Sequence, residues 1–129
     1  MTLASRALRE LASWPELAEA PASCGRDRAL RAAAHEIVHF HADQDVDLHL
    51  TARAIRRLED DLVTSPAIQL VPGSPWITLH LSNDRDIDLL MTLVSAALQA
   101  HQTWPVPSDI PSAGCNDRFG AALPRQSPS

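Results

Sequence analysis

An alternation of side-chain types between residues 34 and 50 constrains the fold more than any other feature of the chain. Successive side chains of a β-strand point to opposite faces of the sheet. A strand over 35–41 would therefore gather four side chains on one face, namely His35, Ile37, His39 and His41. Its other face would carry Glu36, Val38 and Phe40.

The next run continues this pattern. In residues 45–50, the apolar side chains Val46, Leu48 and Leu50 match the face of Val38 and Phe40. Asp47 and His49 then fall beside the histidines. The segment predicts a hairpin with one buried face and one face lined with histidines, and any chemistry is expected on the second face.

Elements of both kinds are predicted along the rest of the chain. A helix begins near Leu3 and breaks at Pro15, and a loop follows over 20–28. Thr51 caps a helix over 52–63, and Ser82 or Asn83 caps a last helix that reaches about His101. Short strands are expected over 67–71 and 76–81, the second with Trp76, Thr78 and His80 on the histidine face.

This order of elements predicts an α+β fold, a helix-ββ-helix-ββ-helix two-layer sandwich whose antiparallel sheet carries the helices on one face. A single domain is expected over 1–103. Residues 104–129 are rich in proline and serine, which predicts a flexible tail.

Composition excludes several classes of function. A net charge of −5 argues against a nucleic-acid partner. No apolar run approaches the roughly 20 residues that a membrane span needs, and charged residues interrupt the N-terminal segment, so neither a membrane partner nor a secretory signal is expected. Cys24 and Cys115 lack metal-ligand spacing and are expected to be free thiols of a cytoplasmic protein.

A family resemblance rests on three short segments. They are His39-Phe40-His41 with Asp43, the pair Asp47-Leu48, and Pro72-Gly73-Ser74 before Trp76. Over about residues 20–101 the chain resembles the small bacterial, chiefly actinobacterial, luciferase-family domain proteins. It departs from the family pattern at Gln44, where a glycine commonly follows the aspartate. The resemblance implies a fold but no substrate.

Two kinds of chemistry fit the histidine face. His39 and His41, at i and i+2, have a workable spacing for one metal ion, with Asp47, His49 and His80 as further ligands. A solvated face that merely tolerates histidine is the more frequent explanation, so no metal ligand is assigned. Alternatively, Asp47 can orient His39 or His41 as a general base, although a cross-strand contact without a reactant is the more frequent explanation here too.

The leading hypothesis is a small cytoplasmic module that binds a ligand or partner through an open sheet face. Its expected ligand-binding residues are Trp76, Thr78, His49 and His80. Trp76 is expected to be exposed there, facing either a small molecule or a second copy in a homodimer. Because exposed positions add little packing, substitution of His41 or Asp47 is expected to change stability by less than about 0.5 kcal/mol.

Two alternatives remain open. One is a small enzyme of specialised metabolism that uses His39, His41 and Asp47 in acid–base catalysis, and the other is a histidine-rich metal-binding protein. Neither a GxGxxG nor a phosphate-binding loop occurs in the chain, so no cofactor is predicted.

Overall fold

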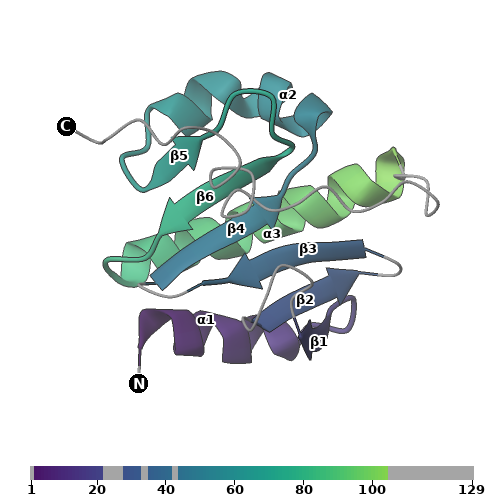
Figure 1. Ribbon diagram of the computed structural model, residues 1–129, viewed down its shortest axis with the longest axis vertical. Helices are drawn as coiled ribbons and strands as arrows, with labels where there is room; N and C mark the ends of the chain where they lie inside the picture. The colour runs from purple at the N-terminus through teal and green to yellow at the C-terminus, as the bar shows by residue number, and fades with distance from the viewer. Residues whose placement is uncertain (1, 22–27, 33–34, 42–43, 105–129) are drawn as a thin grey trace.

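A computed structural model describes residues 2–21, 28–32, 35–41 and 44–104 (Figure 1). The elements in chain order are α1 (Leu3–Ala12), β1 (Ala18–Pro21), β2 (Arg28–Ala32), β3 (His35–Phe40), β4 (Asp45–His49), α2 (Ala52–Val63), β5 (Ile68–Leu70), β6 (Trp76–His80) and α3 (Asp84–Thr103). Cys24, Cys115 and all of the predicted tail except Trp104 lie outside the described residues.

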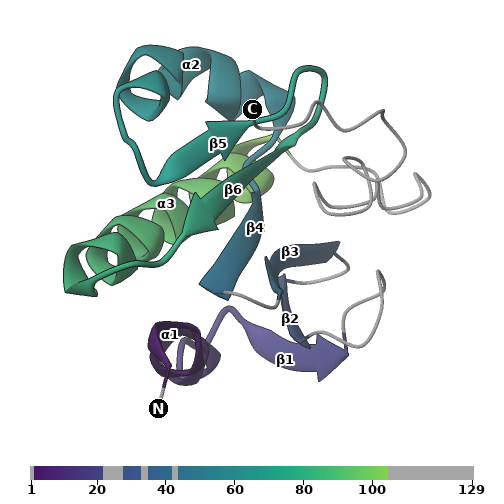
Figure 2. The ribbon, with the colours of Figure 1, turned by 60° about the vertical axis from the view of Figure 1, so that its left-hand side comes forward.

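Within the described residues, six strands form one antiparallel sheet in the order β1-β2-β3-β4-β6-β5. Strands β4 and β6 are neighbours because the chain leaves the sheet through α2, returns at the edge as β5, and then runs back inward. The α+β class and the antiparallel sheet are confirmed. Figure 2 shows α1 and α3 on the same side of this sheet.

Strands β1 and β2 were not predicted. Residues 18–21 read AEAP and 28–32 read RALRA, and neither shows the β-branched or aromatic side chains typical of strands. They form a hairpin nonetheless, because β2 pairs with β3 and buries Ala29 and Leu30 completely. Tertiary packing therefore outweighs local propensity at this end of the sheet.

The core lies between the sheet and the helices. The alternating apolar residues of β3, β4 and β6 face it, and Val38, Leu48 and Ile77 lie opposite one another in adjacent strands. Helix α3 covers them with an apolar stripe in which Leu90, Val94 and Ala97 are fully buried. Burying each large apolar side chain contributes roughly 1.5–3 kcal/mol, so this layer supports the whole sheet.

Two helix starts follow the predicted capping chemistry. Thr51 Oγ1 accepts a hydrogen bond from the Ala54 amide at 3.2 Å, and Asn83, rather than Ser82, caps α3. Asn83 and Asp86 exchange side-chain and backbone hydrogen bonds as a capping box. Among the described helices, none is long and apolar enough to cross a membrane.

Candidate functional site

One face of the sheet gathers the predicted site residues. Strand register aligns His39 with Asp47 and Asp47 with Thr78, and it places His49 opposite Trp76. By the same alternation, His41 and His80 lie on this face, which we call the histidine face. Phe40, Leu48 and Leu79 lie on the helix-covered side, so the predicted division of the two faces is confirmed for these residues.

Asp47 lies at the centre of the histidine face and is only 1% exposed. Its two oxygens accept hydrogen bonds from two strands: Thr78 Oγ1 on β6 donates at 2.6 Å, and His41 Nε2, just after β3, lies at 3.1 Å. A carboxylate accepts from an imidazole N–H, so this contact places the His41 proton on Nε2. The three side chains form a fixed Thr78–Asp47–His41 unit.

Glu36 forms a second carboxylate–imidazole pair that sequence reasoning missed. Its Oε1 lies 2.7 Å from His39 Nε2, although strict alternation had placed Glu36 on the apolar face. The cause is a β-bulge: Leu30 pairs with Val38 but Arg31 pairs with Glu36, so β3 holds one extra residue, Ile37. Ile37 joins the apolar core instead of the histidine face, as a bulge can re-aim side chains.

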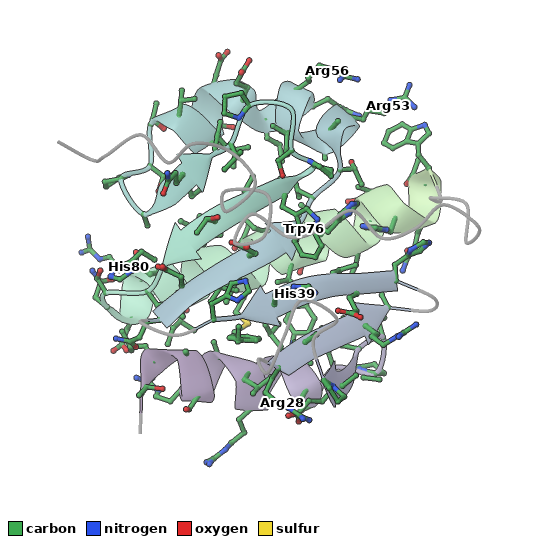
Figure 3. All side chains as sticks on the ribbon, in the orientation of Figure 1. Arg28, His39, Arg53, Arg56, Trp76 and His80 are labelled. Carbon is green, nitrogen blue, oxygen red and sulfur yellow. The ribbon has the colours of Figure 1, made fainter. Side chains whose placement is uncertain are left out.

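The histidine face is not open at its centre. Trp76 and His39 are 1% and 2% exposed, so the expectation of an exposed tryptophan was wrong. The Trp76 ring contacts two imidazoles, with centroids 4.7 Å from His39 and 5.0 Å from His49. Figure 3 shows His39 and Trp76 together at the middle of the sheet. Trp76 therefore packs as a wall between histidines from β3 and β4.

His80 lies at the margin of the same face. Its Nδ1 is 2.7 Å from Asp45 Oδ1, and the two side chains are 57% and 44% exposed. Figure 3 places His80 away from His39 and Trp76, toward the opposite end of β6. This pair has the same chemistry as His41–Asp47 but faces solvent, where an ion pair contributes little to stability.

A further histidine contact joins β4 to α3. His101 Nε2 lies 3.0 Å from His49 Nδ1 and 3.1 Å from the His49 carbonyl oxygen, and His35 lies beside His101 at 6.1 Å between centroids. The chain was expected to end its last helix near His101, but no role was predicted for it. Helix α3 extends past the ends of the strands, and spacing within β3 and β4 cannot reveal that contact.

Burial and neighbouring charge lower the pKa of both histidines in this contact. Burial, followed by the charge of His101, lowers the pKa of His49 from 6.5 to about 4. Burial also lowers the pKa of His101, against the opposing effect of its hydrogen bond to the His49 carbonyl. Both imidazoles are therefore neutral at pH 7.

The histidines do not assemble into a recognisable metal centre. In the described ranges, no group of three or more histidine, cysteine, aspartate or glutamate side chains has an arrangement that could hold a metal ion. His39 and His41 each direct Nε2 at a carboxylate of their own instead.

The position that departs from the family pattern has the backbone expected of a glycine. Gln44 has φ +64°, in the left-handed region where glycine is favoured. Its side chain has a separate role here, because Gln44 Oε1 accepts a hydrogen bond from the Leu3 amide at 3.0 Å. The β3–β4 connection is thereby attached to the first turn of α1.

A family model described as Luciferase domain matches residues 34–97, close to half of the 129-residue chain. The matched segment holds β3 to β6, α2 and most of α3, with every predicted site residue. Over residues 34–97 the chain matches the luciferase-domain family. Neither the curated proteins nor the solved structures contain a significant match to it.

Proposed function

We propose that the chain is a small ligand-binding domain that holds a polar small molecule on the histidine face. The observation that carries the proposal is the pair of carboxylate–imidazole contacts, Glu36–His39 and Asp47–His41, whose rings lie 6.0 Å apart. Trp76 adds an apolar wall beside His39.

The burial of these pairs favours a functional explanation. Removing a carboxylate and an imidazole from water costs several kcal/mol, and apolar residues of similar volume often stabilise a fold as well or better. Two such pairs side by side on a single face are therefore poorly explained by stability alone. Buried titratable groups with specific partners are frequent at functional sites.

The residues suggest the chemistry of the ligand. An imidazole whose Nε2–H is held by a carboxylate has Nδ1 as an acceptor in a fixed direction, which suits a hydroxyl or N–H group on a small molecule. An apolar part of the same molecule would pack against Trp76. A homodimer that uses this face is the competing explanation, and the oligomeric state of the variants distinguishes the two.

One observation favours a second candidate function, acid–base catalysis. Both oxygens of Asp47 are engaged, by Thr78 and by His41, and this fixes the orientation of the His41 ring. A carboxylate that orients an imidazole in this way is the usual support of a histidine general base. Proton transfer by His41 would then use its Nδ1 atom.

A ligand screen with matched variants tests the proposal. A library of polar metabolites is added to the isotopically labelled protein, and histidine side-chain NMR signals and thermal melting are followed. We expect hits that shift the His39 and His41 signals and that stabilise the wild type by about 2.7 kcal/mol at a hundredfold excess over Kd. His41→Asn should weaken such a hit at least tenfold.

His80 was expected among the ligand-binding residues, but the proposed site does not include it, because its exposed pair with Asp45 lies at the margin of the face. His80→Asn is therefore the matched control and should leave binding unchanged. Equal loss of binding in both variants, or hits that perturb only residues remote from His39 and His41, would contradict the proposal. Size-exclusion chromatography of His41→Asn addresses the competing interface. Dissociation of a wild-type dimer by that substitution would favour the homodimer instead.

A further inference from the structure

Five of the six histidines fall into two chemical groups. His39, His41 and His80 each have a carboxylate oxygen within 3.1 Å. His49 and His101 contact each other instead, and histidines alone act on them electrostatically among the described residues. A protonated imidazole in the first group has a counter-charge, whereas one in the second group faces another imidazole.

Hydrogen-bond geometry fixes the tautomers of the second group. The carbonyl oxygen of His49 can only accept, so His101 Nε2 carries the proton that lies between it and that oxygen. The same N–H points at His49 Nδ1, 3.0 Å away, which must then be unprotonated. His49 is accordingly neutral with its proton on Nε2, and His101 is the donor.

Protonation of His101 and protonation of His49 have different effects on this contact. A proton added to His101 Nδ1 leaves the Nε2–H donor and the His49 acceptor unchanged. A proton added to His49 Nδ1 directs two N–H groups at each other at 3.0 Å, and the contact cannot persist. We propose that His49 and His101 form a proton-operated latch that holds the last turn of α3 on the end of β4 and opens when both rings are protonated.

The residues around the latch determine which part of α3 can move when the latch opens. Among the described residues, His35 and His39 on β3 are the titratable groups that face it, and α3 has no other charged side chain after Asp88. Beyond His101, the guanidinium carbon of Arg53 on α2 lies 4.2 Å from the centroid of the Trp104 ring in a cation–π contact. Loss of the His49–His101 contact would thus loosen the last turn of α3, while the contact between Arg53 and Trp104 still holds the residue that follows the helix.

The latch also reaches the proposed ligand site. His49 meets Trp76 edge-on, and Trp76 in turn packs on His39. A displaced His49 would remove support from one side of the tryptophan wall. This last step rests on the proposed function, whereas the latch itself does not.

Histidine ¹⁵N NMR from pH 7.5 to pH 4, together with amide hydrogen exchange, tests the latch in the full-length protein. We expect His49 to hold its proton on Nε2 and His101 on Nε2 at pH 7.5. As His49 becomes protonated, the protection factor of the Trp104 amide, which donates to Ala100 at 2.9 Å, should fall at least tenfold. The opposite tautomers, or unchanged protection while both rings titrate, would overturn the proposal.

Two variants complete the test. In His101→Gln the side-chain amide can donate to neutral His49 or, after rotation, accept from protonated His49, and it takes up no proton. The contact should therefore persist, and the fall in protection of the Trp104 amide on acidification should disappear. His80→Gln removes a histidine outside the latch and should leave both steps unchanged. A loss of the opening in His80→Gln would contradict the latch independently of any result on ligand binding.

Discussion

Asp47 shows how burial changes what a single residue contributes. As an exposed strand residue it was expected to tolerate substitution within about 0.5 kcal/mol. Its side chain is instead almost fully enclosed and accepts from Thr78 and His41, so replacement by asparagine places an N–H where an acceptor is needed. The cost of such a mismatch is about 1–3 kcal/mol. Stability and ligand binding therefore have to be measured separately for this residue.

His49 makes the stability of the fold depend on pH. Its pKa is lowered to about 4 in the folded protein, while an unfolded histidine titrates near 6.5. Below pH 6.5 the unfolded chain binds the proton more readily than the folded protein does. The contribution of neutral His49 to stability is therefore fully present above pH 6.5 and decreases as the pH falls toward 4. The expected loss is on the order of 3 kcal/mol, measured by urea unfolding at pH 7.5, 6, 5 and 4.

The variant His49→Gln separates this effect from general acid denaturation. Glutamine can accept the His101 hydrogen bond but does not titrate, so its stability should depend less on pH over the same range. The exposed variant His80→Gln should keep the wild-type slope. A wild type whose stability is flat between pH 6.5 and 4 would disprove the assignment to His49.

At the scale of the elements, Gln44 links the β3–β4 connection to α1. Its left-handed backbone is strained for a side chain with a Cβ, while its Oε1 caps the Leu3 amide. Gln44→Ala should lose the cap and keep the strain, whereas Gln44→Gly loses the cap and relieves the strain. We expect the glycine variant to be more stable than the alanine variant by about 1–2 kcal/mol in thermal or urea unfolding. Equal stability of the two variants would show that the backbone there is relaxed.

Most elements were predictable because their signals are local. Helix 52–63 follows from Thr51 and its apolar stripe, and β6 follows from the strict alternation of Trp76 to His80. The hairpin β1–β2 was missed because Pro21 and the alanines of 28–32 lack strand propensity, and pairing with β3 decides their conformation.

The candidate site was only partly predictable for a similar reason. Period-two alternation brings His39, Asp47 and Thr78 together correctly, since it operates within regular strands. It fails at Glu36, because the bulge at Ile37 adds one residue that no pattern marks. It cannot indicate the burial of Trp76 or the approach of His101 from α3, because both depend on how distant elements pack.

For the molecule as a whole, the family match covers less of the chain than the fold does. Residues 34–97 leave out α1, β1 and β2, yet Ala7, Leu11 and Leu30 from those elements are fully buried in the core. A fragment limited to 34–104 should therefore lose several kcal/mol of apolar burial. We expect it to be aggregated or unfolded by circular dichroism and light scattering, while the full chain is folded. A monomeric fragment with cooperative melting would contradict this expectation.

The position of the β1–β2 hairpin has a consequence for how such a domain diversifies. Without β2, strand β3 would be the outermost strand, and its free N–H and C=O groups would run alongside His39 and His41 as a template for pairing between molecules. The hairpin supplies that protection with small, weakly strand-forming residues and with the Arg28–Glu19 contact, not with an apolar sequence of its own. Its exposed positions can consequently change widely while the edge stays closed, whereas Ala29 and Leu30 are constrained by the core. We therefore expect sequence differences between related proteins to be more frequent at the exposed positions of the β1–β2 hairpin than in β3 and β4.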